Sequence, residues 1–259
     1  MKVKYLIVFL VTLYLVACAS SAKKMAQQRE KDFQHQYNVG LFHLNEGNAL
    51  QSINYLKKSI KLNPRFYLAY NALGLAYTMQ GDLKKALAYF EKCLQINPNF
   101  TEVHNNLGII YQEMGFLDKA REEYLKVAND PRYPARESAY YNLALLVILQ
   151  GKYQQALEYA NSALKENRRY AMGYNIKGHI LEKMGNLEEA IRNYQQAVNI
   201  VPDEIRFRFN LGVAYFHQKN YQKAEEVFED ILTKPVPPEI KQNIKEYLNK
   251  IKEKTEKNL

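Results

Sequence analysis

The 259-residue sequence lacks the features that most often identify an enzyme. Its glycines are spaced out and never clustered as a phosphate-binding loop requires, and no Gly-x-Ser-x-Gly turn presents a nucleophile. The five histidines have no cysteine, aspartate or second histidine at zinc-ligand spacing; they are His35, His43, His104, His179 and His217. We therefore expect no catalytic site, no metal, no other cofactor and no small-molecule substrate.

Long apolar runs are also scarce, with a single one at the start of the chain. Met1-Lys2-Val3-Lys4 is followed by the uncharged run from Tyr5 to Val16, which is shorter than the roughly 20 residues of a membrane span. A basic start before a short apolar run is typical of a secretory signal. The run ends in Leu15-Val16-Ala17-Cys18, which resembles the bacterial lipoprotein signal that is cleaved before a lipid-carrying cysteine.

That resemblance implies a signal over residues 1–17 and a lipidated, flexible tether over residues 18–32. Two or more acyl chains on Cys18 would anchor the protein firmly, whereas a single chain binds membranes only marginally. Ala19 in place of aspartate implies export to the outer membrane of a Gram-negative cell, with the chain facing the periplasm. The second cysteine, Cys93, then has no disulfide partner, and we expect it to be a buried free thiol.

The basic charge does not indicate a nucleic-acid partner. Loss of Lys2 and Lys4 with the signal lowers the net charge from +9 to +7. The remaining charge is spread over helix faces such as Lys84-Lys85 and Arg121-Glu122-Glu123, and it forms no continuous basic stripe. We interpret these side chains as a solvated helical surface.

A repeat with a period of 34 residues organises the rest of the chain. The marker positions are Gly40, Gly74, Gly108, Ala144, Gly178 and Gly212, at spacings of 34, 34, 36, 34 and 34. Seven residues after the markers stand turn residues that favour positive φ, namely Gly47, Gly81, Gly115, Gly151 and Gly185, with Lys219 in the last unit. Twelve residues after the markers come small residues, Ser52, Ala86, Ala120, Ala156, Ala190 and Ala224.

Two further sets of residues keep the same register. Large rings in the second helix are supplied by Phe90, Tyr124, Tyr194 and Phe228, and closing prolines by Pro64, Pro98, Pro202 and, with drift, Pro134 and Pro237. Together the positions resemble the tetratricopeptide signature over residues 33–238. The resemblance implies an all-α fold, a right-handed superhelix of six tetratricopeptide helical hairpins. The amphipathic segment 239–254 predicts a C-terminal capping helix within the remaining residues 239–259.

An array of this kind binds partners in the groove that is lined by the first helix of each hairpin. We take as groove positions those opposite the packing alanines, and most of them are apolar or aromatic. The set is Tyr37, Leu41, Leu44, Leu68, Asn71, Leu75, Met79, Glu102, Asn105, Ile109, Gln112, Tyr141, Leu145, Ile148, Leu149, Asn175, His179, Arg206, Phe209, Val213 and Phe216. Such a groove suits an amphipathic helix or an extended peptide rather than a clamped C-terminal carboxylate. Each of these side chains could instead pack against a neighbouring helix.

The junction before the fourth unit carries a more specific resemblance. There the chain reads Tyr133-Pro134-Ala135-Arg136 and then Tyr141-Asn142-Leu143, which is similar to a bend in the type IV pilus pilotin family. That family consists of outer-membrane lipoproteins with six tetratricopeptide units. The resemblance implies a non-enzymatic protein that binds secretin subunits and promotes their outer-membrane localisation and multimer assembly. Departures from the strict repeat occur at Lys219, Val147, Leu181 and Arg168.

Two other functions remain open on the sequence alone. One is a periplasmic adaptor lipoprotein of the same fold that recruits cell-wall hydrolases or other envelope assembly factors. The other is a structural envelope lipoprotein with no specific partner. The groove residues do not name a ligand, so they do not separate these alternatives.

Overall fold

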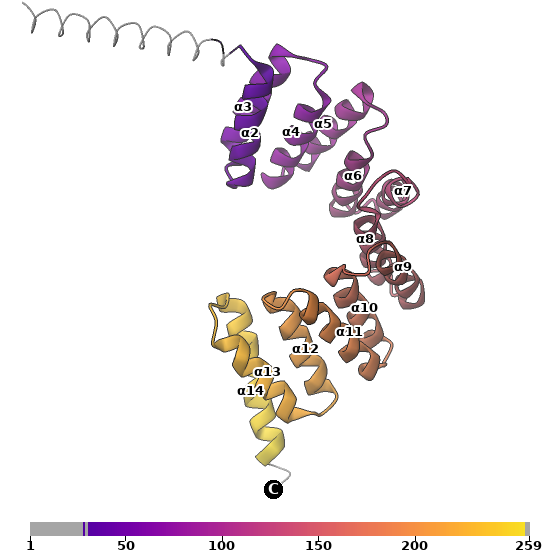
Figure 1. The fold of residues 1–259 in the computed structure, drawn as a ribbon, viewed down its shortest axis with the longest axis vertical. Coiled ribbons are helices and arrows are strands. Elements are labelled where there is room, and N and C mark those ends of the chain that lie inside the picture. Colours follow the sequence, from indigo (N-terminus) through magenta and orange to yellow (C-terminus); the bar gives the residue numbers. More distant parts are fainter. Residues whose placement is uncertain (1–27, 29–30, 257–259) are drawn as a thin grey trace, which may run out of the picture. The chain divides into compact units, whose positions relative to one another are not determined.

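The computed structural model describes residue 28 and residues 31–256, so the expected signal, Cys18 and most of the expected tether lie outside the described residues. Within that part, the chain forms thirteen helices and no strand (Figure 1). The chain divides into two compact units between Phe116 and Leu117. The all-α expectation is confirmed.

The described residues form five helices in the first unit and eight in the second. The helices of unit 1 are α2 (Phe33–Asn45), α3 (Ala49–Leu62), α4 (Tyr67–Met79), α5 (Leu83–Ile96) and α6 (Thr101–Glu113). Those of unit 2 are α7 (Leu117–Ala128), α8 (Arg136–Ile148), α9 (Tyr153–Glu166), α10 (Ala171–Lys183), α11 (Leu187–Ile200), α12 (Ile205–His217), α13 (Tyr221–Leu232) and α14 (Pro238–Glu256). Five hairpins form within the units, α2–α3, α4–α5, α8–α9, α10–α11 and α12–α13, and α14 is the expected terminal helix.

A glycine with positive φ makes the turn inside every hairpin except α12–α13. Gly81, for example, has φ 76° between α4 and α5, a conformation that L side chains rarely adopt. Its amide donates to the carbonyl of Thr78, and the Asp82 side chain then accepts a hydrogen bond from the backbone of Lys85 at 3.1 Å to begin α5. The turn interpretation of the 34-residue pattern is therefore confirmed.

The marker glycines let the two helices of a hairpin pack closely. A Cβ added at Gly74 would lie 2.4 Å from Cε1 of Phe90, whose ring is fully buried in α5. The same contact joins Gly178 to Tyr194 and Gly212 to Phe228. In α8 the marker is Ala144, and the residue at the ring position of α9 is Ala160; both are fully buried. The marker in α8 thus carries a methyl group where the facing position of α9 carries no ring.

Cys93 lies in the core of unit 1, as the sequence predicted. It is a buried free thiol, and burial raises the pKa of Cys93 to about 12. The thiol therefore stays protonated and unreactive at neutral pH.

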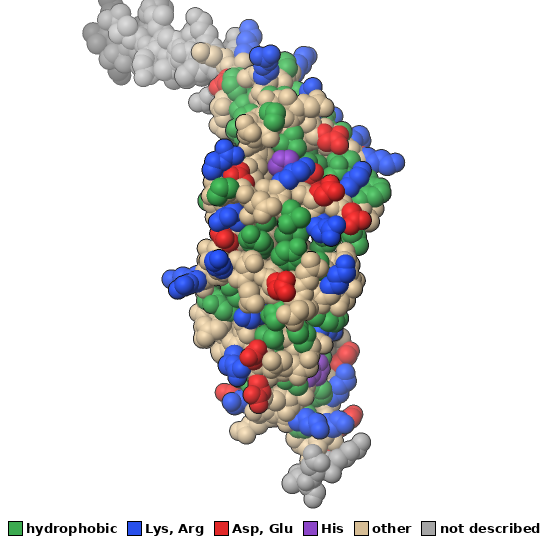
Figure 2. Space-filling model, turned by 90° about the vertical axis from the view of Figure 1, so that its right-hand side faces the viewer, with side chains coloured by type: hydrophobic (Ala, Val, Ile, Leu, Met, Phe, Trp, Pro, Cys, Tyr) green, Lys and Arg blue, Asp and Glu red, His purple; other side chains and the backbone are tan. Residues whose placement is uncertain are grey.

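The surface mixes charges of both signs with apolar side chains. Figure 2 shows one face on which Lys and Arg alternate with Asp and Glu around patches of hydrophobic side chains. Among the described residues, no helix is long and apolar enough to span a membrane.

Lys219 occupies the last turn, where the other hairpins have glycine. Its φ is 64°, so a side chain is held in the left-handed region. Because that conformation costs an L residue roughly 1–2 kcal/mol and glycine little, Lys219→Gly should raise the free energy of unfolding by about 0.5–1 kcal/mol after the entropy cost of glycine. Urea unfolding measures the change. Gly185→Ala, at φ 81° in the preceding hairpin, is the reverse control and should lower stability; an unchanged or lower value for Lys219→Gly would contradict the interpretation.

Candidate partner-binding surface

The first helices of unit 1 bring aromatic rings together across the repeats. Tyr37 of α2 meets the ring of Phe66 edge-on at 5.0 Å, and Tyr67 of α4 meets Phe100 in the same way at 5.0 Å. Burial raises the pKa of Tyr37, and the nearby Glu102 carboxylate of α6 adds to the rise. Tyr37 of α2 therefore lies within electrostatic range of Tyr67 of α4 and Glu102 of α6.

A similar face forms in unit 2 from α8, α10 and α12. Tyr141 of α8 contacts Tyr170 just before α10, with ring centroids 6.0 Å apart at 87°. Burial raises the pKa of Tyr141, while the positive charge of Arg206 on α12 acts in the opposite direction. Nε of Arg206 also forms an ion pair with Oε1 of Glu204 at 3.1 Å. The structure therefore brings Tyr141 and Arg206, both predicted groove residues, into electrostatic range of each other.

Asparagine pairs link successive first helices in both units. Nδ2 of Asn106 donates to Oδ1 of Asn71 at 3.1 Å between α6 and α4. In unit 2, Nδ2 of Asn210 donates to Oδ1 of Asn175 at 2.9 Å between α12 and α10. Asn71 and Asn175 belong to the predicted groove set, whereas Asn106 and Asn210 do not, because each partner lies one residue beyond the 34-residue period.

The predicted groove residues differ in accessibility. The exposed ones are Met79, Leu149, Glu102 and Arg206, of which Met79 and Leu149 are apolar and 51% and 69% exposed. Most of the others are half-buried, namely Tyr37, Leu41, Leu68, Leu75, Asn105, Ile109, Gln112, Tyr141, Leu145, Ile148, Asn175, His179, Phe209, Val213 and Phe216. Met79 in unit 1 and Leu149 in unit 2 are therefore the apolar groove positions most open to a partner.

Two predicted groove residues are buried, and for them the expectation of an accessible side chain was wrong. Leu44 is 9% exposed and belongs to the core cluster with Leu56 of α3. It follows Gly40 by one helical turn and so lies on the face that packs against α3. Asn71, 7% exposed, lies one turn before Gly74 on the equivalent face of α4, where its carboxamide oxygen is bonded to Asn106.

The C-terminal helix covers a second group of predicted groove residues. Tyr247 of α14 contacts Phe209 at 6.0 Å and Phe216 at 5.1 Å, both edge-on. Val213 packs into the same cluster. These residues of α12 support the terminal helix, so they are not open groove positions. The sequence shows that α14 is amphipathic, but it does not show which side chains the helix covers.

His179 is half-buried on α10. Burial lowers the pKa of His179, and the Lys183 ammonium lowers it further, so the ring is neutral at pH 7. Among the described residues, no three His, Cys, Asp or Glu side chains come together as metal ligands. The surface offers apolar side chains, amides and a few charges, which is the chemistry of protein recognition.

Comparisons with known families identify the repeat. Models described as tetratricopeptide repeat match residues 36–66, 67–100, 100–165 and 210–234, and one described as TPR repeat matches residues 178–219. Among curated relatives, the protein O-mannosyl-transferase Tmtc3 of Drosophila melanogaster is 40% identical over 67 residues, which are 26% of this chain and 7% of that protein. The chain spans 8% or less of the length of the first such relatives.

Two solved structures match over most of their length. The structure of Pseudomonas aeruginosa PilF is 22% identical with a TM-score of 0.69, covering 85% of this chain and 99% of that one. The structure of PilW, described as a widely conserved type IV pilus biogenesis factor, is 18% identical with a TM-score of 0.72, covering 82% and 98%. At these identities the likeness establishes the fold. The chain is a tetratricopeptide repeat protein, and its fold is that of a scaffold for binding proteins or peptides.

Proposed function

We propose that this protein is a type IV pilus biogenesis lipoprotein, a pilotin, that binds secretin subunits and promotes their outer-membrane localisation and multimer assembly. The observation that carries the proposal is the match to PilF and PilW over 99% and 98% of their chains. The yeast Tom70 structure, also a tetratricopeptide array, is covered over only 48% of its length. The likeness therefore extends over nearly the whole of both pilus proteins. The Tyr133–Arg136 bend supports the same family.

In this proposal the protein acts by binding, without catalysis. The first-helix faces carry exposed apolar side chains, Met79 in unit 1 and Leu149 in unit 2, next to half-buried rings and amides. A helix or extended segment of the secretin subunit would place apolar anchors against them.

Lipid on Cys18 would also anchor the protein, and with it the bound subunit, to the outer membrane. A protein tethered to the outer membrane holds the bound subunit near its destination, which raises the effective concentration of that subunit at the membrane. The tether proposed over residues 18–32 would span at most about 45 Å for its polar part if fully extended, so the repeats could work away from the lipid surface.

The experiment is to measure heat-resistant secretin multimer on gels of outer membranes from cells with and without this gene. We expect the multimer to disappear without the gene while the monomer is retained. Complementation with the double variant Met79→Glu/Leu149→Glu should restore a tenth or less of the wild-type amount of multimer, because a charge in each apolar contact opposes binding. Leu50→Glu is the matched control: Leu50 is 64% exposed but lies on the second helix α3, so it should complement fully.

A Cys18→Ala variant separates the lipid from the binding surface. We expect it to fold and bind the secretin but to lose outer-membrane fractionation and multimer assembly. A variant that still fractionates with the outer membrane would contradict the lipid assignment. Unchanged multimer in cells lacking the gene would contradict the pilotin proposal and favour an adaptor for cell-wall hydrolases.

A further inference from the structure

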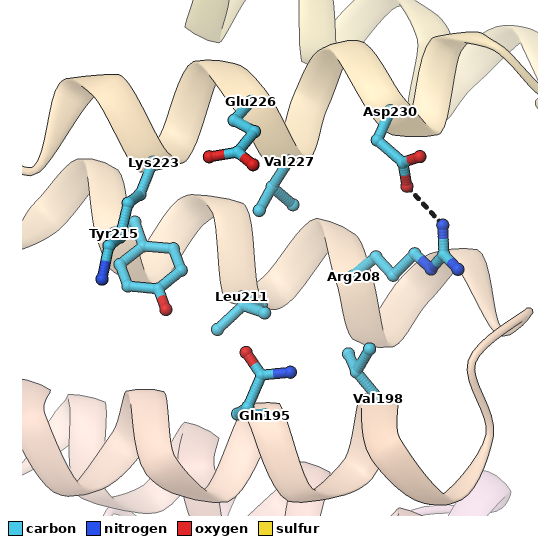
Figure 3. A pocket seen from close by; sticks show the side chains of 9 residues that line it. All are labelled: Gln195, Val198, Arg208, Leu211, Tyr215, Lys223, Glu226, Val227 and Asp230. Atoms are coloured by element: carbon cyan, nitrogen blue, oxygen red, sulfur yellow. Dashed lines mark hydrogen bonds and ion pairs between the residues drawn. The ribbon is translucent and has the colours of Figure 1, made fainter.

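A cavity of about 360 Å³ lies in unit 2 between the second helices α11 and α13, with α12 behind it (Figure 3). Val198, Leu211 and Val227 form its apolar wall. The ring of Tyr215 stands at one end, and the ion pair of Arg208 with Asp230 stands at the other. The cavity therefore combines an apolar interior, an aromatic end and a charged end.

The repeat register allows this cavity to be compared with the equivalent position in unit 1. The markers Gly74 and Gly212 are 138 residues apart, and the same shift relates Tyr77 to Tyr215. It also relates Lys85 to Lys223, and each lysine lies over the ring of its tyrosine, at 5.3 Å in unit 1 and 5.4 Å in unit 2.

The far ends of the two sites are equivalent as well. Tyr70 in unit 1 donates its hydroxyl to the carbonyl of Pro64 at 3.2 Å. Arg208, at the same register in unit 2, donates its Nε to the carbonyl of Pro202, which is the register equivalent of Pro64. The two sites therefore share a backbone frame and differ in their side chains.

The difference that matters is a missing ring. In unit 1, Tyr89 stacks on Tyr77 with ring centroids 5.3 Å apart and an interplanar angle of 6°. The residue at that register in unit 2 is Val227, which lines the cavity. Position 227 is equivalent to position 89. The cavity therefore borders the side of the Tyr215 ring that corresponds to the side of Tyr77 covered by Tyr89.

We propose that this cavity binds a tyrosine side chain of a partner protein, stacked on Tyr215. Two aromatic rings in this arrangement attract each other beyond the area that they bury. Glu226 stands on the wall where unit 1 has Ala88, and its carboxylate provides an acceptor for the phenol hydroxyl. Because the rim carries charges of both signs, it favours a neutral side chain with a polar tip over an ionic ligand.

This site does not depend on the proposed pilus function. It is formed by α11, α13 and the face of α12 that holds Arg208, Leu211 and Tyr215, whereas the first-helix face holds Arg206. A partner could therefore occupy it while another segment lies on the first-helix face.

The test is titration of the full chain with N-acetyl-tyrosinamide, followed by amide chemical shifts. We expect shifts centred on Tyr215 and Val227, with a dissociation constant on the order of 1 mM, as suits so small a ligand. N-acetyl-leucinamide should bind at least about fivefold more weakly, since it cannot stack. Equal affinity for the two probes, or no shifts near Tyr215, would overturn the proposal.

Two variants exchange the sites between the units. Val227→Tyr supplies the ring from the chain itself and should weaken binding at least tenfold while the thermal midpoint does not fall. Tyr89→Val should open the equivalent site in unit 1 and produce a second set of shifts around Tyr77. Tyr215→Leu gives an independent check that requires no added ring, and it should weaken the tyrosine probe but not the leucine probe. Retained affinity in both Val227→Tyr and Tyr215→Leu would refute the site.

Discussion

Gly74→Ala should destabilise unit 1 by about 1–3 kcal/mol, although alanine is normally the better helix former by about 1 kcal/mol. The new methyl group would lie 2.4 Å from the ring of Phe90, well inside contact distance. The ring is fully buried in the core of unit 1 and packs among other buried side chains, so it cannot turn aside without disturbing them. The change is measured by urea unfolding of the full chain.

The same pair gives a sharper result as a double-mutant cycle. Phe90→Ala alone should cost about 3–5 kcal/mol, because it leaves a cavity where a whole ring was. In that background Gly74→Ala should change sign and become neutral or stabilising, since the methyl group then fills part of the cavity. The chain carries this combination in α8 and α9, where Ala144 faces the position of Ala160. If the two losses simply add, the packing account is wrong.

The control lies in that natural alanine pair. Ala144→Gly should lower the free energy of unfolding by about 1 kcal/mol, because glycine is the poorer helix former and no large ring faces this position. If the marker position favoured glycine regardless of packing, the same substitution would raise the free energy of unfolding. The opposite signs expected for the two sites separate packing from propensity.

The hairpins could be predicted from the sequence because their determinants are local. A glycine seven residues after all but the last marker fixes a turn through its own backbone, as Gly81 does at φ 76°. A small residue beside a large ring fixes how closely two neighbouring helices pack, as Gly74 and Phe90 do. Both constraints act within one hairpin, so the period alone contains them.

The binding surface could be predicted only in part, because exposure depends on what packs over a helix. Leu44 and Met79 are both late in a first helix, but Leu44 points to α3 and is buried while Met79 is half exposed. Phe209 is a predicted groove residue, but Tyr247 of α14 packs against its ring. The sequence register shows that Val227 replaces the ring of Tyr89, but the cavity beside Tyr215 appears only in the structure.

Removing α14 should have the largest effect on unit 2. Ile244 and Ile251 are buried within the cluster that also holds Phe228, and the ring of Tyr247 stacks on Phe228 at 5.4 Å. A chain that ends at residue 237 loses these contacts and leaves the apolar side of α12 and α13 open to water. Because terminal repeats need a helix with a polar outer face to stay soluble, we expect the truncated protein to self-associate and to unfold at a lower temperature.

The single substitution Tyr247→Ala tests the same contact without removing the helix. Tyr247 meets Phe209, Phe216 and Phe228, so we expect a loss of about 2–4 kcal/mol, at the lower end of the range for deleting an aromatic ring because Tyr247 is only half-buried. Asn243→Ala, on the exposed side of α14, is the matched control and should change stability by less than about 0.5 kcal/mol. Circular dichroism melting and size-exclusion chromatography give both readouts.

A truncated chain that stays monomeric with an unchanged midpoint would show that α14 is dispensable. In that case Phe209 and Phe216 would have to be counted as groove residues after all, since nothing essential would hold the helix over them.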